Sequence, residues 1–104
     1  MGFDPDRTLK EMLGAMQGVV TQKWPEVEQF VQKAIENERE ALVQIADMRL
    51  TGDLTDAEME QELANQADIL EAELLAAQVM TKAMAQRAVG EALGVLRKAV
   101  RAAL

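Results

Sequence analysis

Glu38 is the residue whose type and position point most directly to chemistry. Apolar residues recur around it at helical spacing, with Ala34 before it and Ile45 after it, so its carboxylate lies on an apolar helix face. A carboxylate buried in such a face has a raised pKa and can act as an acid, a base or a metal ligand. Glu62 and Glu73 are the candidate companions for a carboxylate metal or acid/base site.

The rest of the composition offers this site little help. The chain contains no histidine and no cysteine, which removes the commonest general base, the commonest transition-metal ligand and all thiol chemistry. Ferritin-like di-iron bundles need a Glu-x-x-His motif, which this chain cannot form. The alternative is that Glu38 is a structural residue that fixes helix register or is exposed at a gap in the bundle. We favour the structural interpretation and assign no catalytic residue, cofactor site or metal ligand.

The elements that position these carboxylates are predicted to be helices within one domain, residues 1–104. Apolar residues make up 49% of the chain but aromatics only 3%, so the core must consist of Ala, Leu, Val and Met, which suits close-packed helices. The sequence contains no internal repeat and no low-complexity linker. We therefore expect an all-α fold.

Start and stop signals divide the chain into three predicted helices, over residues 5–21, 25–51 and 56–103. Asp4 and Pro5 form an N-cap followed by proline at the first helical position, and Pro25 disfavours helical backbone at the residue before it. Gly52 can adopt the left-handed conformation that ends a helix. Thr55 and Glu58 have the spacing of a capping box.

No proline interrupts residues 56–103, so we predict one continuous rod of roughly 72 Å. The short connector at Gly52 makes this rod antiparallel to the helix before it. The result is a long helical hairpin, in which residues whose numbers sum to about 107 face each other and Glu38 faces the neighbourhood of Gln66, Asp68 and Leu70. The sequence leaves open whether the first helix continues the second with a kink at Pro25 or folds back.

A second apolar stripe on the long helix predicts that the hairpin does not work alone. An isolated two-helix layer leaves much apolar surface wet, and pairing of two hairpins into a four-helix arrangement is the simplest remedy. We therefore expect a homodimer whose interface is centred on this stripe: Ile69, Ala72, Ala76, Val79, Met80 and Ala83.

Charge is distributed unevenly along the chain. Residues 34–73 carry twelve acids and two bases, a net −10, whereas residues 74–104 carry one acid and five bases, a net +4. In a hairpin, the acidic tip and the basic open end lie far apart, so antiparallel packing of two hairpins brings opposite charges together. We therefore expect the homodimer to be antiparallel.

The basic segment 82–104 is itself amphipathic, with Val89, Leu93 and Leu96 on one side and Arg97 and Arg101 on the other. Such a helix can bind a membrane surface, and a peripheral membrane binder is our third candidate function. The segment has no aromatic residue to anchor at an interface or stack on bases, and the chain is acidic overall, so we expect no nucleic acid partner and consider a membrane partner secondary.

Two small-residue motifs, Gly14-x-x-x-Gly18 and Gly90-x-x-x-Gly94, have the spacing of close helix contacts. Their positions on the helical wheel argue against direct contact between them.

The function that the sequence favours is a non-enzymatic helical module for protein–protein interaction. It would act as a homo-oligomer and bind a further protein as a regulator, an adaptor or a chaperone-like factor. The N-terminal residues lack the basic and apolar regions of a secretory signal, and we expect the protein to be cytoplasmic.

Overall fold

The computed structural model describes residues 2–104 and confirms the all-α fold class. The order of elements along the chain is α1 (Pro5–Val20), the short 3-10 helix η1 (Thr21–Lys23), α2 (Trp24–Asn37), α3 (Arg39–Leu50), α4 (Asp56–Ala76) and α5 (Lys82–Ala103). Within the described residues no strand occurs. None of these helices is both long enough and apolar enough to cross a membrane.

Several predicted helix ends are present. The Asp4 side chain accepts a hydrogen bond from the backbone N–H of Arg7 at the start of α1. Thr55 and Glu58 form the capping box of α4, with N···O distances of 3.2 Å to the Thr55 hydroxyl and 2.9 Å to the Glu58 carboxylate. Gly52 ends the α3 side of the connector with φ of +87°, the left-handed conformation that glycine adopts without strain.

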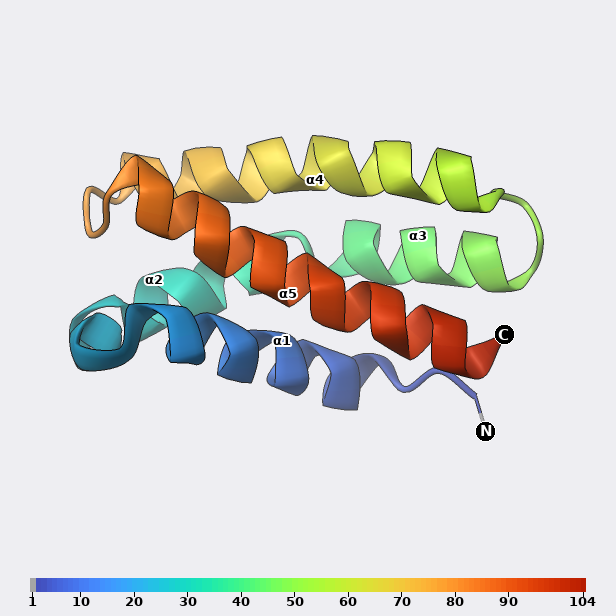
Figure 1. Ribbon diagram of the computed structural model, residues 1–104, viewed down its shortest axis with the longest axis horizontal. Helices are drawn as coiled ribbons and strands as arrows, with labels where there is room; N and C mark the ends of the chain where they lie inside the picture. The colour runs from blue at the N-terminus through green and yellow to red at the C-terminus, as the bar shows by residue number, and fades with distance from the viewer. Residues whose placement is uncertain (1) are drawn as a thin grey trace.

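The prediction of one continuous helix over residues 56–103 is wrong. The chain leaves helical conformation after Ala76, Gln78 adopts a positive φ of 57°, and α5 begins at Lys82. The Thr81 hydroxyl caps the new helix by accepting a hydrogen bond from the backbone N–H of Met84. Because of this turn α5 runs back along α4, and the molecule measures 39 × 24 × 19 Å instead of forming a long rod (Figure 1).

The reason for the turn is burial. Seven residues of α5 are buried in the folded chain: Ala85, Ala88, Val89, Ala92, Leu93, Leu96 and Val100. Each large apolar side chain removed from water contributes about 1.5–3 kcal/mol. A non-glycine residue in left-handed backbone costs roughly 1–2 kcal/mol, so the gain from covering α5 exceeds the cost at Gln78.

The prediction of one helix over residues 25–51 also needs correction, because the helix is interrupted at Glu38. Glu38 has φ of −102° and ψ of 6°, which lies outside the helical region, and α3 restarts at the next residue. The first helix does not continue the second. It turns through η1 and folds back, so α1 lies alongside α5 (Figure 1).

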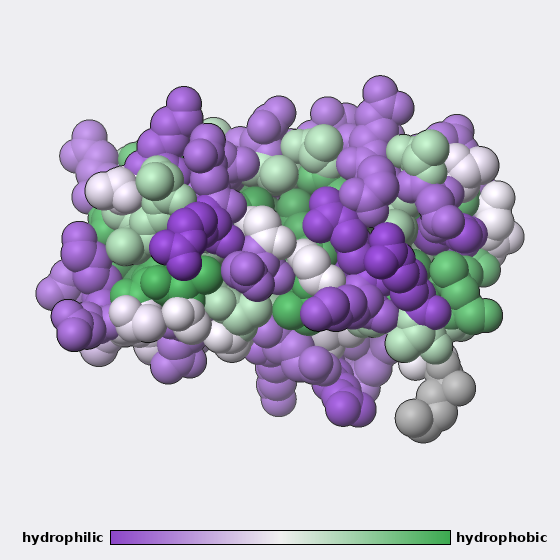
Figure 2. All heavy atoms as spheres, viewed as in Figure 1, coloured by the Kyte–Doolittle hydropathy of each residue, from purple (hydrophilic) through white to green (hydrophobic). Residues whose placement is uncertain are grey.

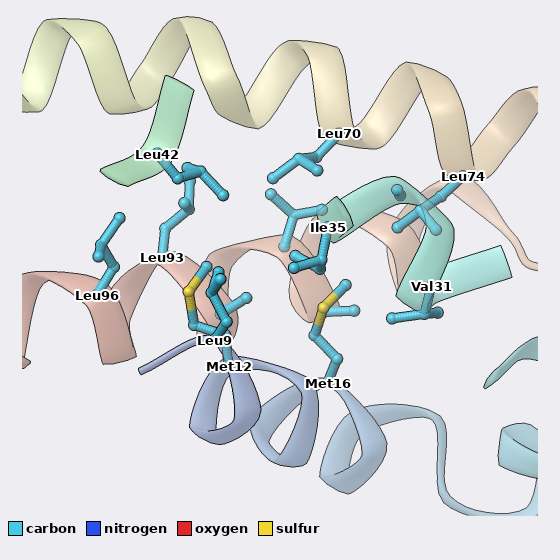
Figure 3. Packing of buried hydrophobic residues seen from close by; sticks show 14 of the residues in the cluster. Leu9, Met12, Met16, Val31, Ile35, Leu42, Leu70, Leu74, Leu93 and Leu96 are labelled. Carbon is cyan, nitrogen blue, oxygen red and sulfur yellow. The ribbon is translucent and has the colours of Figure 1, made fainter. Parts of the chain in front are cut away.

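A single core fills the space between these helices. Figure 3 shows buried side chains of α1, α2, α3, α4 and α5 pointing into the same interior: Leu9, Met12, Met16, Val31, Ile35, Leu42, Leu70, Leu74, Leu93 and Leu96. The thin two-helix layer that motivated dimerisation is therefore replaced by a bundle within one chain. The four glycines of the small-residue motifs are not needed for close packing, since a Cβ at any of them meets nothing within 4 Å.

Candidate functional site

The bend between α2 and α3 places Glu38 against α4. Its side chain is half-buried, and its backbone N–H is shared between the carbonyls of Ala34 and Ile35 at 3.3 and 3.2 Å. The residue that it meets on α4 is Glu73. Glu73 lies about one helical turn beyond the predicted neighbourhood of Gln66, Asp68 and Leu70.

The two carboxyl groups affect each other strongly. Burial raises the pKa of Glu73 to about 7, and a hydrogen bond with Glu38 and repulsion from its negative charge act in the same direction. Glu73 Oε2 is buried and accepts no hydrogen bond. Two ionised carboxylates have no proton to donate, so a proton on Glu73 supplies the donor that this pair lacks.

Glu62 does not join this pair, which corrects the predicted trio of Glu38, Glu62 and Glu73. Glu62 lines a cavity farther along α4, between that helix and α3. Among residues 2–104, no three acidic side chains converge in a way that would hold a metal ion. The structure thus assembles two of the three predicted carboxylates.

Cavities in the surface lie elsewhere. One of them is lined by Glu62, and we name it the α3–α4 cavity. Its volume is about 250 Å³, and its lining residues are Ala41, Gln44, Ile45, Met48, Leu54, Glu62 and Gln66. A larger groove of about 560 Å³ runs between α1 and α2, and the ion pair of Arg39 with Asp6 bounds it. Glu38 and Glu73 line neither of these cavities.

Gln66 is the site residue that sequence reasoning missed. It is only 9% exposed, and its Oε1 atom is buried without a hydrogen-bond partner. Buried polar groups are nearly always paired, so an orphaned amide that lines a cavity requires an explanation. The signal in the sequence was its position at helical spacing between two core residues, Leu63 and Leu70.

The predicted interface stripe is divided by the turn after α4. Met80 is buried in the core and Val79 is half-buried, whereas Ala83 is exposed at the start of α5. The remaining residues of the predicted stripe lie on one side of α4 and are exposed. We call them the α4 outer strip: Ile69, which is 42% exposed, Ala72 and Ala76.

The basic helix α5 does not project into solvent as an unpartnered helix. Its apolar face, including Val89, Leu93 and Leu96, is buried in the core. Its basic end returns to the acidic start of α4, where Arg97 Nε lies 2.8 Å from Glu60 Oε1. The acidic tip and the basic end are therefore neighbours within one chain, which contradicts the separation assumed in the sequence analysis.

Hydrophilic side chains cover much of the face shown in Figure 2, with hydrophobic residues visible between them. The chain matches no protein-family model, no curated protein and no solved structure in the comparisons.

Proposed function

We propose that this chain is a non-enzymatic helical module for protein–protein interaction that associates through the α4 outer strip. The observation that supports this proposal is the exposure of Ile69, Ala72 and Ala76 on an otherwise acidic helix. Their spacings of three and four residues place them on one side of α4. A second surface that covers the strip would remove this apolar area from water, which favours association.

A second copy of the chain is the partner that we propose for the strip. Two α4 helices related by a two-fold axis near Ala72 would run antiparallel, so that each strip covers the other. This arrangement keeps the two acidic first turns, each with Asp56 and Glu58, far apart. The strip is small compared with the roughly 1,200–2,000 Å² of stable interfaces, so we expect weak and reversible association.

Ala72→Glu tests the proposal, with Ala64→Glu as its matched control. Both alanines are exposed on α4, but Ala64 lies about two turns nearer the start of the helix and roughly 80° around it from Ala72, outside the strip. Light scattering over a range of concentrations should show reversible dimers for the wild type and for Ala64→Glu, and monomers for Ala72→Glu. Both variants should keep the thermal stability of the monomer. A wild-type protein that remains monomeric at high micromolar concentration contradicts the proposal.

A carboxylate acid/base site centred on Glu38 is the second candidate. The contact with Glu73 and the raised pKa of that residue support it. Against this candidate, a substrate needs a cavity beside the reacting group, and neither Glu38 nor Glu73 lines the α3–α4 cavity or the α1–α2 groove. The third candidate, peripheral membrane binding through residues 82–104, would require α5 to detach and expose its buried apolar face.

A further inference from the structure

We propose that the α3–α4 cavity binds a basic side chain, arginine in preference to lysine, presented by a partner protein. This inference rests on the proposed function, because it names the chemistry of what the interaction module binds. It concerns a surface different from the α4 outer strip.

The size and walls of the cavity suit one long side chain. Its volume of about 250 Å³ lies below the roughly 300–1,000 Å³ that drug-sized ligands and cofactors occupy. Ile45, Met48 and Leu54 supply apolar contacts, and the methylene groups of arginine or lysine pack well on such surfaces. One side chain of a docked protein therefore fits the cavity better than a free cofactor does.

Polar groups at the cavity accept hydrogen bonds and lack positive charge. Gln66 lines the cavity, is nine-tenths buried and has an unpartnered carbonyl oxygen. Its amide can turn about the last torsion to present that oxygen to a ligand. Gln44 and the carboxylate of Glu62 complete the polar lining, and no lysine or arginine belongs to it.

The surrounding charge favours a cation. Residues 34–73 carry twelve acids and two bases, and both bases already have partners within the chain. Arg39 pairs with Asp6, and Arg49 Nε lies 2.7 Å from Asp56 Oδ1. The negative charge around the cavity is therefore largely uncompensated within residues 34–73, and it attracts a positive group from another molecule. Arginine offers five donors in a planar fork and suits a carboxylate beside two amides better than the point charge of lysine does.

The test uses isotope-labelled full-length protein and a neutral-ended pentapeptide of four alanines around one arginine. In an NMR titration at millimolar peptide concentration, shifts should concentrate in residues 41–48 and 62–66. The same peptide with lysine should bind more weakly. The peptide with citrulline, which keeps the shape but removes the charge, should show no localised shifts. Shifts equal for the arginine and citrulline peptides, or no shifts at all, overturn the inference.

Two variants and one control locate the binding. Glu62→Gln and Gln66→Leu should each lower the affinity for the arginine peptide at least about fivefold. The first removes a charged hydrogen-bond acceptor and the second a buried one. Asp68→Asn removes one charge from an exposed position elsewhere on α4 and should change affinity less than twofold. Equal losses in all three would show diffuse attraction to an acidic surface and overturn the inference.

Two readouts separate this inference from neighbouring ones. If the labelled protein shows the same localised shifts on concentration alone, a second copy supplies the arginine and the proposed partner is wrong. Light scattering of Glu62→Gln should match that of the wild type, since Glu62 does not belong to the α4 outer strip. Loss of association in Ala72→Glu together with absent peptide binding would refute the inference and leave the proposed function intact.

Discussion

Glu38 and Glu73 bring two carboxyl groups together where the bend between α2 and α3 meets α4. Glu73 Oε2 is buried there without a hydrogen-bond donor. The pair gains from holding one proton, because that proton supplies a donor and removes the repulsion between two negative charges. The contact thus links the protonation of Glu73 to the packing of three helices.

The first prediction is that this pair makes stability depend on pH. The pKa of Glu73 rises from 4.5 to about 7 on folding, so the folded state binds the proton more tightly than the unfolded chain. Its contribution to stability is fully present below about pH 4.5 and is lost as pH rises through about pH 7. Glu73→Gln should therefore gain stability relative to the wild type between about pH 5 and pH 8, as measured by urea unfolding.

The control for this prediction is Glu71→Gln, the same change two residues earlier on α4. Glu71 is also half-buried but does not take part in the carboxyl pair. The unfolding free energy of the Glu71→Gln variant should change with pH in the same way as that of the wild type across this range. If Glu73→Gln also runs parallel to the wild type, the coupling between Glu38 and Glu73 is absent.

Glu38→Leu gives the second prediction. At about pH 8 the substitution removes a half-buried charge that repels Glu73, so the melting temperature should stay the same or rise. At about pH 5 it removes the acceptor for the Glu73 proton, so the advantage should shrink or reverse. Thermal unfolding at both pH values, followed by circular dichroism, measures the difference. Strong destabilisation at both pH values would mean that the Glu38 side chain has another essential partner.

The sequence signals that succeeded are local ones. Asp4 caps α1, Thr55 and Glu58 cap α4, and Gly52 takes the left-handed conformation, as their types and spacing predict. Each of these features depends on a few adjacent residues. The helical nature of the chain and the starts of α1 and α4 could therefore be predicted without knowledge of the fold.

The errors have a different physical origin. Apart from Thr81, the residues around Gln78 give no clear signal of a helix end, and the turn there forms because it lets α5 bury its apolar face in the same chain. Tertiary burial of this kind overrides local propensity. The facing positions were derived from two uninterrupted helices and therefore placed Glu38 opposite Gln66, Asp68 and Leu70, about one turn before its contact with Glu73. Thr81 was the one local hint, as an N-cap residue in the middle of the predicted rod.

The third prediction distinguishes the turn at Gln78 from a continuous helix by the sign of the change in unfolding free energy that one substitution causes. In the fold described here Gln78 has φ of 57°, a conformation that glycine adopts at no steric cost. Gln78→Gly should therefore stabilise the protein by up to about 1 kcal/mol, after the extra entropy of the unfolded glycine is subtracted. In a continuous helix the same change would destabilise the protein by about 1 kcal/mol.

Gln86→Gly is the matched control, because Gln86 is an exposed residue within α5. It should lower the free energy of unfolding by about 1 kcal/mol, as glycine does inside a helix. Urea unfolding of the two variants should therefore give shifts of opposite sign. Destabilisation of similar size in both would show that α4 and α5 form one helix. In that case the α3–α4 cavity would be kept, because residues of α5 do not line it. The contact of Arg97 with Glu60 would be lost, since it requires α5 to return along α4.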